Sequence, residues 1–315
     1  MAKYPSEIFG YPYWNKGPKA TEIRQKHWCP FVNKVCYKPS RLIDFPFGVC
    51  SAHVSGEDIA LCPRRFLDQH AVFSDIALHH FKTTDNILVF SEIRLGDIGN
   101  FDFVMLRHKP MSAEIEDFVA IEFQTGQTTG TGQLVKGLTD FLENKGVDYK
   151  TKSYNFGLNM YDIWKRTFTQ ILNKGVIMEN WSKKIYWIVQ DPVYKNFEAR
   201  YNLQHLAFQT QHSTVFALYD LKPNEDRFDL IACRKVSASM DQLFASFRNN
   251  PNNPPVEKFM KTLEAKIEGE AQISLHLGRP SKMGVVDVKP PTASGKFHEE
   301  PGGKPESDTD NREDS

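Results

Sequence analysis

Two apolar runs, each interrupted by an acid, constrain the fold of this chain more than any other feature. They are Asn100–Leu106, which contains Asp102, and Phe118–Gln124, which contains Glu122. Both runs are rich in Val, Ile and Phe, a composition typical of β-strands. Because side chains alternate along a strand, Glu122 and Gln124 are predicted to share one face and the apolar residues beside them the other.

The acids in these runs predict a metal site. A carboxylate inside an apolar strand is costly unless something pairs with it, and a divalent cation is one such partner. If neighbouring strands bring Asp102 and Glu122 together, they form an oxygen-lined site for magnesium, a hard cation that favours carboxylates. Such a site suits metal-assisted hydrolysis of a phosphodiester. The alternative is that both acids are ordinary strand residues that face water.

Three successive strands are predicted, at Asn86–Leu95, Phe101–Leu106 and Phe118–Thr125. A Gly-Asp-Ile-Gly turn separates the first two, which predicts an antiparallel hairpin. Glu92 lies on the first strand. The register of the hairpin decides whether Glu92 stands beside Asp102 as a third acid or points the other way.

The rest of the chain predicts an α/β (α+β) fold with a mixed central sheet flanked by helices. The apolar stripe of Asn159–Lys174 indicates a helix, and Lys183–Gln190 reads as a buried strand that returns parallel to an earlier one. Residues 283–315 have the composition of a disordered tail. Further helices are predicted at 64–80, 133–144, 240–248 and 256–267, and further strands at 215–221 and 227–233.

Four of the five cysteines cluster near the N-terminus, at Cys29, Cys36, Cys50 and Cys62. Thiolates bind zinc or iron tetrahedrally, and such a site can hold together a segment with little apolar core. This part of the chain shows no long periodic apolar run, so it fits that need. The spacing lacks the close cysteine pairs of a zinc finger. The alternative is that the thiols are simply buried, as we expect for Cys233.

The histidines near these elements are predicted to be structural. His27 and His53 could each replace a cysteine as a metal ligand, but a surface or hydrogen-bonded role is the preferred interpretation. His79 and His80 are adjacent, so on a helix they diverge and do not readily share a metal.

Composition limits the classes of protein that fit. The chain has 315 residues, 40% hydrophobic and 25% charged, as in ordinary globular proteins. Its zero net charge excludes an overall basic signature, so binding to nucleic acid would depend on local patches. We find no signal peptide and no run of about 20 apolar residues. A cytoplasmic protein without a membrane partner is expected, in which reduced cysteines favour metal over disulfides.

The order of these motifs resembles a known superfamily. An Asp and a Glu-x-Gln on antiparallel strands, followed by a helix and a parallel strand, resemble the catalytic core of PD-(D/E)xK nucleases. The third position is most often Lys there, whereas Gln124 carries no charge. An Asp and a Glu-x-Gln combined with an upstream four-cysteine segment resemble, more narrowly, the NotI-type restriction endonucleases. CPFVNKVC at 29–36 and SEIRLGDIGNFDFVML at 91–106 carry this likeness, which covers roughly residues 29–190.

The resemblance assigns roles to these residues. Asp102 and Glu122 would hold magnesium, Gln124 would orient the attacking water or stabilise charge at the phosphate, and Glu92 is a further candidate acid. The site residues of the N-terminal segment would be Cys29, Cys36, Cys50 and Cys62. They would hold one structural iron, or zinc, because both metals accept four thiolates.

The resemblance also implies a biological role. It implies a prokaryotic, cytoplasmic type II restriction endonuclease, a homodimer that cuts double-stranded DNA at a GC-rich palindrome, because protein and site share two-fold symmetry. Residues 1–80 would form an arm and the metal segment for DNA recognition, and residues 81–282 the nuclease domain. The alternatives are a metal-stapled, non-catalytic DNA-binding module and a repair or junction nuclease of the same fold.

Overall fold

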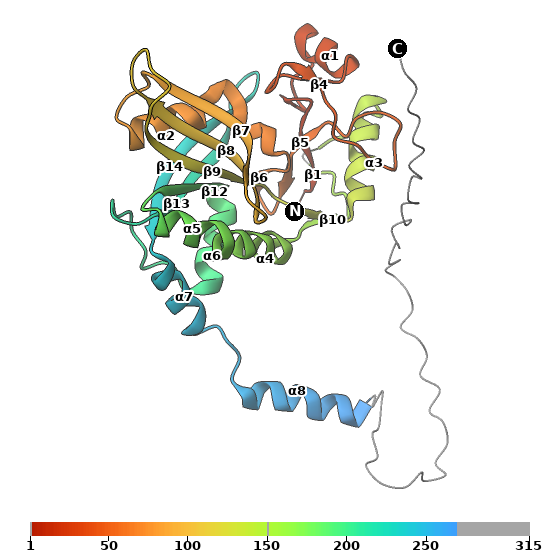
Figure 1. Ribbon diagram of the computed structural model, residues 1–315. Helices are drawn as coiled ribbons and strands as arrows, with labels where there is room; N and C mark the ends of the chain where they lie inside the picture. The colour runs from red at the N-terminus through yellow and green to blue at the C-terminus, as the bar shows by residue number, and fades with distance from the viewer. Residues whose placement is uncertain (1, 150, 270–315) are drawn as a thin grey trace, which may run out of the picture. The chain divides into compact units, whose positions relative to one another are not determined.

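A six-stranded mixed sheet forms the centre of the structure, in the order β14-β13-β12-β9-β8-β7. The computed structural model describes residues 2–149 and 151–269 (Figure 1). β12 runs parallel to β9 and β13, and the other neighbours are antiparallel, including the predicted β7–β8 hairpin. The strands are β7 (Ile87–Leu95), β8 (Gly99–His108), β9 (Ile115–Gln124), β12 (Lys184–Gln190), β13 (Thr214–Pro223) and β14 (Phe228–Ala238). The prediction of a mixed sheet is confirmed.

Helices cover both faces of this sheet (Figure 1). Each face has its own apolar cluster, and the alternation along β9 divides Ala120 from Ile121 and Phe123 between them. One face packs against α4 (Met160–Gln170), α5 (Val176–Asn180), α6 (Asp191–Tyr201) and α7 (Met240–Arg248). The other packs against the 3-10 helix η1 (Pro63–His70) and α2 (Ala71–His80).

A smaller sheet forms the N-terminal part, in the order β2-β1-β5-β6. It packs against α3 so closely that a Cβ at Gly137 would lie 2.7 Å from Pro5 Cδ. A third apolar cluster fills this region, so the expectation of little apolar core there was wrong. The elements are β1 (Tyr4–Ile8), β2 (Tyr11–Pro12), α1 (Pro18–Gln25), β3 (Trp28–Cys29), β4 (Lys34–Val35), β5 (Val49–Val54), β6 (Glu57–Ala60), β10 (Thr128–Thr129), α3 (Thr131–Leu142) and β11 (Gly157–Leu158).

Two predicted helices differ from the observed ones. The helix predicted at 64–80 is divided into η1 and α2, because Gln69 and His70 adopt left-handed backbone conformations between them. The helix predicted at 159–174 does not end there. It continues from α4 through a π-helical turn, η2 (Ile171–Gly175), into α5. Cys233 lies on β14 as predicted but is exposed, because β14 is the outermost strand of the sheet.

Arg65 joins the small sheet to the large one. Its Nε lies 2.9 Å from Glu7 Oε2 on β1, and its guanidinium donates to the Phe228 carbonyl on β14 at 2.6 Å. The Arg65 side chain is fully buried. In keeping with these interactions, the chain up to Asn252 forms one compact unit that includes both sheets.

The second unit begins at Asn253 and contains α8 (Val256–Gly269). Its exposed apolar residues recur at helical spacing along one stripe: Val256, Phe259, Met260 and Leu263. Within the described part of the chain, no helix is both long and apolar enough to cross a bilayer. The tail predicted at 283–315 lies outside the described residues.

Candidate active site

Asp102 and Glu122 lie together on neighbouring strands. The antiparallel register of β8 and β9 sets Phe103 opposite Ile121, which brings the two acids to adjacent positions. The Asp102 backbone amide donates to Glu122 Oε1 at 3.4 Å, and the Phe123 amide donates to Asp102 Oδ2 at 2.8 Å. The strand pairing therefore produces the predicted proximity of the two carboxylates.

The environment of these acids opposes their charge. Glu122 is fully buried, and its Oε2 has no hydrogen-bond partner among the described residues. Burial, together with the Asp102 carboxylate, raises the pKa of Glu122 to about 7, although Lys174 opposes the shift. Burial also raises the pKa of Asp102, and Glu92 adds to that effect. A hard divalent cation fits this site, because the unpaired oxygen of Glu122 lies beside a second acid, Asp102.

Gln124 is held by α4 at both ends of its amide. Its Nε2 donates to Gln170 Oε1 at 2.8 Å, and its Oε1 accepts from Thr167 Oγ1 at 3.0 Å. The side chain is 2% exposed, on the same face of β9 as Glu122. It borders the cavity that contains Asp102. The predicted shared face is thus observed, with a helix fixing the amide.

Glu92 faces the same cavity from β7. Its backbone is left-handed, with φ of +54°, between the paired residues Ser91 and Ile93. The Asn100 side chain donates to Glu92 Oε2 at 3.5 Å. Non-glycine residues seldom adopt this conformation within a strand, and such strain is often found at functional sites. Of the two orientations left open by the sequence, the structure shows the one beside Asp102.

Two cavities that share Arg166 lie at this site and next to it. The first, of about 560 Å³, is lined by Asp102, Glu92 and Gln124 together with the basic residues Arg64 and Arg166. The second, of about 630 Å³, shares Arg166 with the first. It adds polar and basic side chains from the N-terminal part, from the segment between β9 and β10, and from the N-cap of α4: Lys38, Ser40, Arg41, Gln127 and Asn159. Basic side chains beside paired acids suit a phosphodiester backbone.

The four clustered cysteines, Cys29, Cys36, Cys50 and Cys62, border one cavity of about 230 Å³. Burial raises the pKa of three of these thiols, Cys50 most strongly. All five cysteines of the chain are free thiols. Among the described residues, however, no group of three or more His, Cys, Asp or Glu side chains has the arrangement of a metal site. The structure therefore brings the thiols to one cavity, and the metal stays a prediction.

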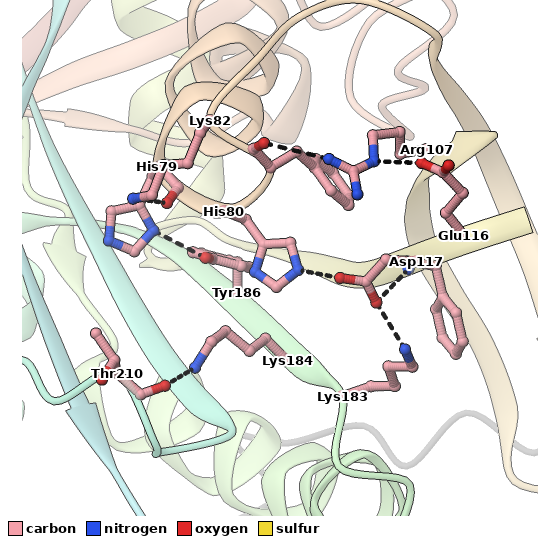
Figure 2. A network of polar contacts seen from close by, with 12 residues as sticks. His79, His80, Lys82, Arg107, Glu116, Asp117, Lys183, Lys184, Tyr186 and Thr210 are labelled. Carbon is pink, nitrogen blue, oxygen red and sulfur yellow. Dashed lines mark hydrogen bonds and ion pairs between the residues drawn. The ribbon is translucent and has the colours of Figure 1, made fainter. Parts of the chain in front are cut away.

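A polar network at the opposite end of β9 provides a contrast (Figure 2). There Asp117 accepts from Lys183 at 2.6 Å and contacts His80 at 2.8 Å, while Arg107 pairs with Glu116 at 2.8 Å. These contacts lower the pKa of Asp117 against the effect of burial. Both oxygens of Asp117 thus have a basic partner, whereas Glu122 Oε2 has no hydrogen-bond partner among the described residues. His80 is hydrogen-bonded within this network, and its structural role stays a prediction.

Sequence reasoning missed the helix residues that complete the site. Lys174 Nζ lies 2.6 Å from Glu122 Oε1 and is almost completely buried. Thr167 and Gln170, which hold Gln124, belong to the same helix face. One signal was present in the sequence, because Thr167, Gln170 and Lys174 recur at helical spacing toward the strand that carries Glu-x-Gln.

Paired acids and a fixed glutamine lie beside a cavity with basic side chains, an arrangement that suits hydrolysis of a phosphodiester. The chain matches the family model described as restriction endonuclease NotI over residues 16–230, and it belongs to that family. It is therefore a site-specific deoxyribonuclease, a type II restriction endonuclease that cleaves double-stranded DNA at a specific site. The match extends beyond the segment that carried the resemblance, into β14. No curated protein matches the chain closely.

Proposed function

We propose that Asp102 and Glu122 are the catalytic carboxylates of this restriction endonuclease and hold magnesium between β8 and β9. One observation carries the proposal: Glu122 Oε2 is buried beside Asp102 without a hydrogen-bond partner among the described residues. A buried carboxylate oxygen without a partner is costly, and a cation removes that cost. Magnesium is commonly held by one or two carboxylates with waters completing its shell, so two acids suffice.

When bound, magnesium would lower the pKa of a water molecule and offset charge on the scissile phosphate. The chain contributes the positions of the groups around the phosphate. The Phe123 amide fixes one oxygen of Asp102, and Asp102 lines the first cavity. Arg166 lines both cavities and would contact phosphate oxygens. In-line attack by water would then leave a 5′-phosphate and a 3′-hydroxyl.

Gln124 and Glu92 would have supporting roles. Thr167 and Gln170 on α4 hold both ends of the Gln124 amide. Gln124 would therefore keep α4 in position beside the attacking water. Glu92 would add a third acid at the mouth of the cavity. The order β7, β8, β9, helix and parallel β12 supports a PD-(D/E)xK core with Gln at the third position.

We further propose that Cys29, Cys36, Cys50 and Cys62 hold one structural iron or zinc. The convergence of these four thiols on one cavity supports this assignment. The segment between Cys36 and Cys50 carries Lys38 and Arg41, which line the second cavity. A metal at the cysteines would therefore brace basic side chains that can meet DNA.

The quaternary and domain assignments are also proposals. A homodimer that cuts a GC-rich palindrome remains our expectation for this family, since two-fold symmetry would match protein to site. Residues 1–80 would serve DNA recognition, and residues 81–282 would serve catalysis. Sedimentation of the purified protein with and without DNA tests the dimer directly.

Glu122→Ala tests the catalytic assignment. It removes a proposed magnesium ligand and leaves the basic side chains that line the two cavities in place. Cleavage should therefore be abolished, while DNA binding with calcium in place of magnesium stays near wild type. Glu116→Ala is the matched control, because Glu116 is also on β9 but pairs with Arg107 at the opposite end of the strand. Retained cleavage in Glu122→Ala, or cleavage with lost binding, would overturn the assignment.

A further inference from the structure

We propose that Lys174 is a positioning residue for DNA cleavage, which supplies to Glu122 the positive charge that Gln124 cannot contribute. This inference rests on the proposed role of Glu122. Lys174 Nζ donates to Glu122 Oε1 at 2.6 Å and to the Asn100 carbonyl at 2.5 Å. The Lys174 residue is 5% exposed. Its cation is thus committed to the site and is largely withdrawn from solvent.

The helix geometry explains how Lys174 reaches this position. α4 ends at Gln170, and the chain continues through the π-turn η2, which contains Lys174, before α5 begins. π-helical turns are rare overall, but those that occur are often found at functional sites, because they reorient side chains within a helix. The turn is packed tightly, since a Cβ at Gly175 would lie 3.1 Å from Met240 Sδ. Packing therefore holds the backbone next to Lys174, and the two hydrogen bonds of Nζ set the direction of its side chain.

One face of this helix forms hydrogen bonds with two successive side chains on the same face of β9. Thr167 and Gln170 hold Gln124, and Lys174, one turn further, holds Glu122. The helix row and the strand alternation match, so each polar residue of Glu-x-Gln has a partner on the same helix. The charge normally carried by the third motif residue is here carried by the helix.

The two oxygens of Glu122 have different surroundings, and this difference defines the role of Lys174. Oε1 is occupied by Lys174, while Oε2 has no partner among the described residues. Lys174 therefore holds the carboxylate in one orientation and leaves the second oxygen for a cation. It also offsets charge where Asp102 and Glu122 repel each other. Without it, both acids would remain but Glu122 would lose its fixed orientation.

The test compares Lys174→Met with Lys174→Arg and Lys174→Gln. Lys174→Met removes the charge at similar length, and misplacement of a catalytic ligand can lower kcat about 100-fold. We expect that loss with KM for DNA, and DNA binding in calcium, unchanged. Lys174→Arg should recover at least about a tenth of the rate, because it restores the charge. Lys222→Met is the control, since it removes an exposed lysine paired with Asp220.

The concentration of magnesium at half-maximal rate separates positioning from structural damage. Removal of a positive charge leaves two uncompensated acids, so magnesium should bind as tightly as in the wild type or more tightly while kcat falls. Weaker magnesium binding in proportion to a lower Tm would show a merely structural role and overturn the proposal. So would a folded Lys174→Gln protein with a wild-type rate, even if Lys174→Met does not fold.

The Glu122→Ala variant distinguishes this inference from the assignment on which it depends. If Glu122→Ala is inactive and folded Lys174 variants cleave normally, only the role of Lys174 is refuted. If Glu122→Ala still cleaves DNA, the catalytic assignment itself fails, whatever the Lys174 variants do.

Discussion

The backbone amide of Phe123 donates to Asp102 Oδ2 at 2.8 Å, which ties the acid of β8 to the strand that carries Glu122. This bond orients Asp102 without neutralising it. Two acids with raised pKa values are therefore held at adjacent positions by the strand pairing, at a cost in stability that the fold must offset elsewhere. Strain and like-charge repulsion of this kind are common where a site is organised for a ligand.

Asp102→Asn should separate catalysis from stability. The amide oxygen still accepts from Phe123, but one negative ligand is lost, so cleavage should fall by at least about 1,000-fold. Because repulsion with Glu122 is relieved, the free energy of unfolding should stay constant or rise by up to about 1 kcal/mol. Denaturant unfolding and single-turnover cleavage measure the two quantities. Wild-type cleavage by a folded Asp102→Asn protein would exclude a catalytic role.

Gln124→Ala should affect the rate of cleavage more than the fold. It removes the hydrogen bonds to Thr167 and Gln170, at a cost of about 1–2 kcal/mol in unfolding free energy. The rate should fall about tenfold or more, because α4 is no longer held against the strand that carries Glu122. Gln170→Ala breaks only one of these bonds and should have the smaller effect on rate. A Gln124→Ala protein that fails to fold would instead identify Gln124 as structural.

Cys50→Ser should remove the structural metal. We expect one iron or zinc per chain in the wild type, measured by elemental analysis, and none in this variant. Metal binding contributes directly to folding in such segments, so the unfolding free energy should fall by about 3 kcal/mol or more. Cys233→Ser is the control, because Cys233 is exposed on β14 and does not line the cysteine cavity. Metal-free wild-type protein with full stability would refute the site.

Arg65→Met should destabilise the chain strongly. It leaves Glu7 buried without a charged partner and breaks the bond to Phe228 of the large sheet, so a loss of about 3–5 kcal/mol is expected. Glu7→Gln added to Arg65→Met should recover part of that loss, which a double-mutant cycle measures. Additive effects of the two substitutions would show that the pair does not connect the small sheet to the large one.

The local elements of the large sheet were predictable from the sequence. Runs such as Lys183–Gln190 are buried on both faces, and this leaves a continuous apolar signal that predicts a parallel strand. The proximity of Asp102 and Glu122 also followed, because the runs that contain them are adjacent antiparallel strands. The shared face of Glu122 and Gln124 depended only on strand periodicity.

The rest depended on contacts between distant segments. Lys174 meets Glu122 through a π-turn that has no clear sequence signature, and helical spacing alone gave that residue no partner. The short strands of the small sheet form a core only by packing against α3 and aromatic residues that are distant in the sequence. The local sequence of these strands therefore did not predict a core. Cys233 is exposed because its strand is outermost, a property of topology that the local pattern does not contain.

The most direct test of the account is to incubate the purified protein with a long DNA of known sequence, with and without magnesium, and to sequence the fragment ends. The account predicts discrete, magnesium-dependent ends that carry 5′-phosphates and share one palindrome, and no cleavage by Glu122→Ala. Uncut DNA from a folded, metal-loaded wild-type protein, or ends without a common sequence, would contradict it.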